Sequence, residues 1–294
     1  MLKIISLLAG IGIVLISSAQ SSVEKPRILY GSITKDSLLS APFDKWFGTG
    51  YDGYKPDATT VELLRKKSLK DYSIEIFFGT WCGDSKREVP HFMKLLSDIS
   101  FPVYNLKMIA VGGSDSLYKQ SPDHQEKGLG IFKVPAIIIY KKGTEVNRII
   151  EYPALSLEKD LLSIMENEPV VANYHTFPLV NKWLKDGTLL DDNVNSRSLA
   201  AQLKLLAGNE YELNSLGYVL LAQDRKKEAL KIFQVNNNLY PESANVLSSL
   251  GEAYQKNGDN KNAVSYLEKA LEQNKDPQSV KGILEILYQA KGVK

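Results

Sequence analysis

The feature that most constrains the fold of this 294-residue chain is its single cysteine, Cys82, which follows a β-prone run and precedes an amphipathic one. Residues 74–78 (IEIFF) are rich in β-branched and aromatic side chains, which predicts a buried strand. Apolar residues then recur at helical spacing over residues 89–96, which predicts a helix. The cysteine therefore lies where a helix begins. The free N–H groups there favour an anion, so a thiolate forms more readily than in water.

The residues around Cys82 resemble the active-site turn of thioredoxin-fold proteins. The tripeptide Trp81-Cys82-Gly83 follows the predicted strand, and Pro90 stands where that family carries a helix-kinking proline. Val134 and Pro135 precede a second β-prone run, where the family has a cis-proline that faces the active-site turn. This resemblance implies an α/β thioredoxin-like fold, in which helices flank a mixed central sheet.

The chain departs from the family's motif at two positions next to the thiol. Ser85 stands in place of the second, resolving cysteine, and Asp84 stands in place of the usual proline. The resemblance implies that Cys82 is the nucleophile and that the Ser85 hydroxyl stabilises its thiolate, whereas the charge of Asp84 opposes the thiolate. It also implies that five residues around the thiol contact the substrate: Trp81, Gly83, Asp84, Val134 and Pro135.

The last third of the chain contains an internal repeat of 34 residues. Three pairs of positions share this offset: Leu216 and Leu250, Gly217 and Gly251, and Phe233 and Leu267. The pattern resembles tetratricopeptide repeats, in which a small residue on one helix lets its partner helix approach closely. Residues 171–294 are therefore predicted to form an all-α helical repeat domain that binds partner proteins.

These patterns divide the chain into a signal peptide (1–19), a lead-in segment (20–54), a thioredoxin-like domain (55–170) and the helical repeat domain. The first segment has a lysine at position 3, an apolar centre and small residues before position 20, as export signals do. Its apolar run is shorter than the ~20 residues that span a bilayer as a helix. We expect an exported protein, periplasmic or secreted, without a membrane span in the mature chain; a retained N-terminal anchor is the alternative.

Two loops are predicted around the thioredoxin-like domain. Residues 43–54 combine five aromatic residues with three glycines. This segment is expected either to pack its rings on the domain or to form a lip over the active-site turn. Residues 114–130 are polar and predict an inserted connection with a short helix near residues 123–129.

Composition argues against several classes of function. The net charge of +2, without a basic cluster, argues against a nucleic-acid partner. The three histidines, His91, His124 and His175, are scattered without the spacing of metal ligands. We therefore assign no metal and no cofactor.

Three hypotheses follow for the function of the chain. In the first, it is a monothiol reductase or isomerase that acts on protein disulfides through a mixed disulfide at Cys82. In the second, it is a non-catalytic binding module whose repeats are the main recognition surface. In the third, the thiol serves another covalent chemistry or binds a metal. The sequence leaves open whether Cys82 is catalytic, and therefore whether the protein is an enzyme.

Overall fold

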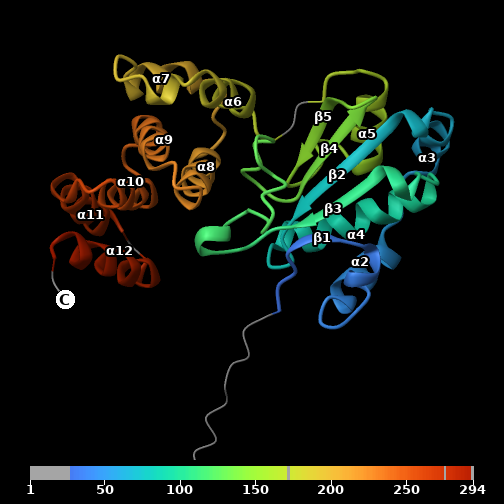
Figure 1. Cartoon of the computed structure of the whole chain (residues 1–294), viewed down its shortest axis with the longest axis horizontal. Coiled ribbons are helices and arrows are strands. Elements are labelled where there is room, and N and C mark those ends of the chain that lie inside the picture. Colours follow the sequence, from blue (N-terminus) through green and yellow to red (C-terminus); the bar gives the residue numbers. More distant parts are fainter. Residues whose placement is uncertain (1–26, 171–172, 275, 293–294) are drawn as a thin grey trace, which may run out of the picture.

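The computed structural model describes residues 27–170, 173–274 and 276–292, and shows an α/β region followed by a helical region (Figure 1). The predicted signal peptide lies outside the described residues. The α/β region contains one five-stranded sheet with the order β1-β3-β2-β4-β5. Its strands are β1 (Gly31–Ile33), β2 (Tyr72–Phe78), β3 (Leu106–Ala110), β4 (Ala136–Lys141) and β5 (Thr144–Ile150). Strands β2 and β3 are parallel and the other pairs are antiparallel, so the predicted mixed sheet is confirmed.

Strand β2 lies at the centre of this sheet, and its carboxyl end is buried on both faces. Ile74, Ile76 and Phe78 point into the larger core cluster, whereas Phe77 points into a smaller cluster on the opposite face. Polar Ser73 and Glu75 alternate with buried Ile74 and Ile76 in the first part of the strand, and burial on both faces at its end explains the continuous apolar run Ile76, Phe77 and Phe78. Among the described residues, five helices accompany the sheet: α1 (Lys35–Leu38), α2 (Asp44–Gly53), α3 (Ala58–Arg65), α4 (Gly83–Asp98) and α5 (Leu157–Met165).

The lead-in segment is not the loop that its glycines suggested, because most of residues 43–54 form helix α2. The helix packs against α4, and Phe47 is fully buried between them in the core. Gly50 permits this contact, since an added Cβ would lie only 2.6 Å from Cγ of Pro90. The aromatic rings therefore pack on the domain, and tertiary packing outweighs the low helix propensity of glycine. The same lead-in supplies strand β1.

The loop between β3 and β4 also differs from the prediction. Residues 123–129 form turns and not a helix, and the only short helical turn in the described part of this loop is Asp115–Leu117. The buried carboxylate of Glu126 accepts hydrogen bonds from the backbone N–H and the hydroxyl of Ser121, at 2.9 and 2.8 Å. Such bonds from side chain to backbone compete with helix formation, which explains the turns.

The helical region consists of paired helices that stack in sequence order (Figure 1). They are α6 (Phe177–Asp186), α7 (Ser196–Leu203), α8 (Tyr211–Ala222), α9 (Lys226–Leu239), α10 (Ala244–Lys256), α11 (Asn260–Gln273) and α12 (Pro277–Ala290). A Cβ added to Gly217 would lie 2.4 Å from the ring of Phe233, and one added to Gly251 would lie 2.7 Å from Leu267. The predicted close approach of paired helices is therefore confirmed in both repeats.

The two regions share part of their hydrophobic core. Phe132 and Ile150 come from the α/β region, yet both belong to the buried cluster that holds Tyr174, Val180 and Leu216 of the helical region. The helical region therefore shares this cluster with the α/β region, whereas a second buried cluster, around Ala263, Leu267 and Leu287, belongs to α10, α11 and α12 alone. Within the part of the chain that the structure describes, no helix is long and apolar enough to cross a membrane.

Candidate functional site

Cys82 is the N-cap residue of helix α4, as its position in the sequence predicted. Its backbone N–H donates to Gly79 O at 2.9 Å, and its carbonyl accepts from Lys86 N at 3.0 Å, so the turn into the helix is closed. The side chain is half-buried, and its thiol donates a hydrogen bond to the carbonyl of Val134 at 3.3 Å. The Val134–Pro135 peptide bond is cis, which confirms that prediction. A backbone edge thus lies directly beside the sulfur.

Trp81 is held in place on the side of the thiol that faces β3. Its indole N–H donates to the carbonyl of Val111 at 2.9 Å, and its ring lies over Gly113, where an added Cβ would be 2.9 Å away. The ring centroid is 6.3 Å from that of Tyr118 in the following loop. Trp81 therefore connects the thiol to this loop, which the sequence alone did not indicate.

Ser85 and Asp84 have partners that the sequence did not specify. Ser85 is fully buried, and its hydroxyl oxygen accepts the backbone N–H of Gly79 at 3.1 Å. This bond holds the strand end against the helix, which is a structural task separate from stabilising a thiolate. Asp84 forms an ion pair with Arg87 at 2.7 Å, so its negative charge is countered locally. Arg87 also binds the buried Glu88, and the hydrogen bonds to Glu88 and Asp84 raise the pKa of Arg87 against the effect of burial.

Lys119 is a buried cation close to this site that the sequence gave no reason to single out. Its ammonium group donates to the carbonyl of Phe132 at 2.9 Å and to the hydroxyl of Ser215 on α8. Burial, the largest cause, and nearby Lys133 lower the pKa of Lys119, whereas the charges of Glu151 and Cys82 raise it; the pKa is about 7 as a result. A lysine in a polar stretch normally indicates a solvated side chain, but this one is enclosed between Tyr118, Phe132 and Ser215 of α8.

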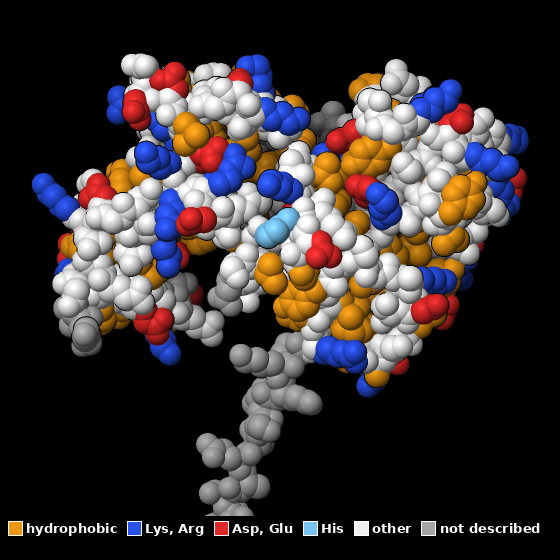
Figure 2. Space-filling model, viewed as in Figure 1, with side chains coloured by type: hydrophobic (Ala, Val, Ile, Leu, Met, Phe, Trp, Pro, Cys, Tyr) orange, Lys and Arg blue, Asp and Glu red, His pale blue; other side chains and the backbone are white. Residues whose placement is uncertain are grey.

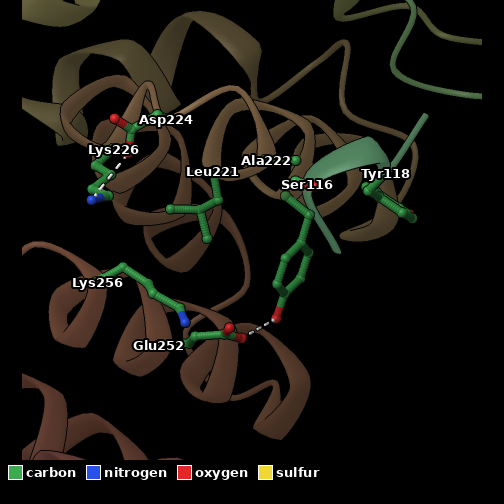
Figure 3. Close-up of a pocket in the computed structure, with 9 residues that line it drawn as sticks. Ser116, Tyr118, Leu221, Ala222, Asp224, Lys226, Glu252 and Lys256 are labelled. Carbon is green, nitrogen blue, oxygen red and sulfur yellow. Dashed lines mark hydrogen bonds and ion pairs between the residues drawn. The ribbon is translucent and has the colours of Figure 1, made fainter. Parts of the chain in front are cut away.

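A cavity of about 640 Å³ lies between the loop after β3 and the helical region (Figure 3). The loop contributes Ser116 and Tyr118, and helices α8 and α10 supply most of the remaining wall. The hydroxyl of Tyr218 donates to the carboxylate of Glu252 at 3.0 Å, which joins α8 to α10 within this wall. We call this cavity the inter-region pocket. Its lining residues are Ser116, Tyr118, Tyr218, Leu221, Ala222, Asp224, Lys226, Glu252 and Lys256.

Comparison with protein families identifies one of the two predicted repeats. Residues 246–281 match the family model of the tetratricopeptide repeat, a range that covers most of α10, all of α11 and the start of α12. The chain therefore contains a tetratricopeptide repeat, and Glu252 and Lys256 of the inter-region pocket lie within it. A search of curated proteins finds no match to the chain.

Proposed function

We propose that this protein binds polypeptide partners through its helical repeats. The observation that carries the proposal is the tetratricopeptide match over residues 246–281, together with the cavity that opens beside α8 and α10. Stacked helix pairs present an extended surface whose side chains are free to contact a ligand, because each pair buries only the faces turned to its neighbours. A polypeptide can bind to such a surface without any reaction of the Cys82 thiol.

A capture experiment with matched charge reversals tests this function. The baits are the wild type and two variants. The first variant carries Lys226→Glu and Lys256→Glu, at two exposed lysines that line the inter-region pocket. The control carries Lys204→Glu and Lys281→Glu, exposed lysines on or next to α7 and on α12, which give the same change in net charge outside the pocket. Polypeptides captured by the wild type should still be captured by the control variant but not by the first variant. Equal capture by the two variants, or no capture by the wild type, contradicts the proposal.

A second candidate function, thiol–disulfide exchange, is favoured by the geometry at Cys82. We infer a thioredoxin-like fold for the α/β region from its sheet order, the thiol at the start of α4 and the Val134–Pro135 segment beside the sulfur. Cys82 is only half-buried, which suits a nucleophile. Export, which the sequence of residues 1–19 predicts, would place the thiol where partner proteins carry disulfides.

Trapping of mixed disulfides tests the second candidate. Ser85 offers no second thiol, so an intermediate between Cys82 and a partner should accumulate. Incubation with an oxidised extract of cell-envelope proteins should give adducts that dithiothreitol releases, and Cys82→Ser should abolish them. Ser85→Cys should lower the amount of adduct, since a neighbouring thiol can then displace the partner. If the wild type gives no reducible adducts and Cys82→Ser still captures partners, binding stands as the function and exchange is excluded.

A further inference from the structure

The inter-region pocket and the thiol site meet at Tyr118. This residue lines the pocket, and in Figure 3 it lies at the opposite end from Asp224 and Lys226. Its ring is also the neighbour of Trp81, with 6.3 Å between the ring centroids, and Trp81 precedes the reactive cysteine. Figure 2 shows a hollow between the α/β region and the helical region. A ligand in the pocket therefore lies against the same loop that supports the thiol.

The lining of the pocket indicates what kind of ligand it takes. Its apolar wall comes from Tyr118, Tyr218, Leu221 and Ala222, and its charged groups are two lysines and two carboxylates. Balanced charges give no preference for a strongly charged ligand such as a nucleic acid or a phosphate. Lysines and carboxylates alternate over the helical region as a whole (Figure 2). The pocket therefore suits a short stretch of polypeptide that has bulky apolar side chains and no large net charge, and its volume lies within the usual range of ligand sites.

We infer that this pocket binds an extended segment of a polypeptide partner and presents a disulfide of that partner, a few residues away, to Cys82. An extended chain advances ~3.3 Å per residue, so about two residues bridge the separation between the Tyr118 and Trp81 rings. The inference rests on both functions proposed above, because it joins binding by the repeats to exchange at the thiol. It identifies the substrate as a protein disulfide flanked by a large apolar residue.

The chemical step requires no reagent beyond the two partners. The Cys82 thiol releases its proton to solvent, and the thiolate attacks one sulfur of the partner's disulfide. A bond forms between Sγ of Cys82 and that sulfur while the partner's own sulfur–sulfur bond breaks. The second partner sulfur leaves as a thiolate and takes up a proton. Binding in the pocket raises the effective concentration of the disulfide at Cys82 without any change in this chemistry.

The test compares two activated disulfides. The first probe is a short peptide in which phenylalanine, two glycines and a cysteine follow one another, with the cysteine held as a mixed disulfide with thionitrobenzoate. The second probe is the same activated cysteine without the phenylalanine and the glycines. Release of thionitrobenzoate measures the attack by Cys82. With the wild type, we expect the peptide probe to react about tenfold faster than the minimal probe because the pocket holds it.

Substitutions in the inter-region pocket test whether the faster reaction of the peptide probe depends on binding there. Ala222→Phe fills the pocket from α8, and Ala201→Phe places the same side chain at an exposed position on α7. Ala222→Phe should remove the advantage of the peptide probe and leave the minimal probe unchanged, whereas Ala201→Phe should change neither rate. Leu221→Ala, with exposed Leu205→Ala as its control, repeats the comparison if the larger substitution prevents folding.

Each other outcome overturns the inference in a distinguishable way. Equal rates of the two probes with the wild type, or an advantage that persists in Ala222→Phe, show that the pocket presents no substrate. Equal slowing of both probes in Ala222→Phe shows that the substitution acts on the thiol itself. If neither probe reacts with the wild type, exchange at Cys82 fails as well. The binding function is judged separately, from capture by the Cys82→Ser protein.

Discussion

The buried amine of Lys119 predicts that the protein becomes more stable as the pH rises above neutrality. The pKa of Lys119 is about 7 in the folded chain and 10.5 in its ordinary, solvated state. Between these values the unfolded chain binds more protons than the folded one, so the free energy of unfolding increases with pH. The increase is at most ~1.4 kcal/mol per pH unit and amounts to about 2 kcal/mol between pH 7 and pH 9. Below about pH 6 both states carry the proton, and the contribution of this group is constant.

The substitution Lys119→Met isolates this effect because it leaves no buried acceptor without a donor. The hydroxyl of Ser215 still donates to the carbonyl of Phe132 at 2.6 Å, which keeps that contact between the two regions. Methionine has a similar length and adopts the same left-handed backbone, φ 54°, at the same conformational cost as lysine. The free energy of unfolding of the variant should lack the rise of about 2 kcal/mol between pH 7 and pH 9.

Urea denaturation at several pH values and constant ionic strength measures the difference between the two proteins. Urea is uncharged and therefore does not screen the interactions of Lys119, unlike guanidinium chloride. The control is Lys127→Met, an exposed lysine in the same loop, which should keep the slope of the wild type. Parallel pH dependences of the wild type and Lys119→Met would show that Lys119 does not titrate in this range, and would refute the reasoning.

Three further predictions concern packing and the loop before α4. Gly217→Ala should lower the free energy of unfolding by about 1–3 kcal/mol, because its Cβ would overlap the ring of Phe233. A Cβ added to Gly282 on α12 would meet no atom within 4 Å, so Gly282→Ala should instead raise the free energy of unfolding by up to ~1 kcal/mol. Thermal unfolding of both variants measures this difference. Ser85→Ala should cost about 1–3 kcal/mol in urea denaturation, since the buried N–H of Gly79 loses its acceptor. The helical region expressed alone should unfold with lower cooperativity than the full chain, as circular dichroism can show, because two buried members of its core are missing.

Local patterns were sufficient to predict the strand, turn and helix around Cys82. The apolar residues of β2 and the helical spacing in α4 each mark a buried face, and the spacing of apolar residues within one segment can be read directly from a sequence. The repeat was predictable for the same reason, since Gly217 and Gly251 mark the same contact twice. In both cases the residues that decide the structure lie close together in the chain.

The remaining features depend on contacts between distant residues, which a local pattern does not show. Helix α2 forms despite its glycines because α4, farther along the chain, covers it. The ammonium group of Lys119 contacts Ser215 of α8, and α8 begins more than ninety residues later. The hydroxyl of Ser85 was predicted to serve the thiolate, but the closing of the turn places its oxygen on the N–H of Gly79. Each of these three features is determined by contacts that form only in the folded chain.

The contact between Gly217 and Phe233 has a consequence for the evolution of this chain. In the next repeat the same contact joins Gly251 to Leu267, so an aromatic ring and a branched aliphatic side chain occupy equivalent gaps. In each repeat, the glycine position and the side chain opposite it occupy the same space between the two helices. A larger residue at the first position is therefore tolerated only when the second becomes smaller. Among descendants of this sequence, we expect the two positions of a pair to change together, and the two repeats to drift independently of each other.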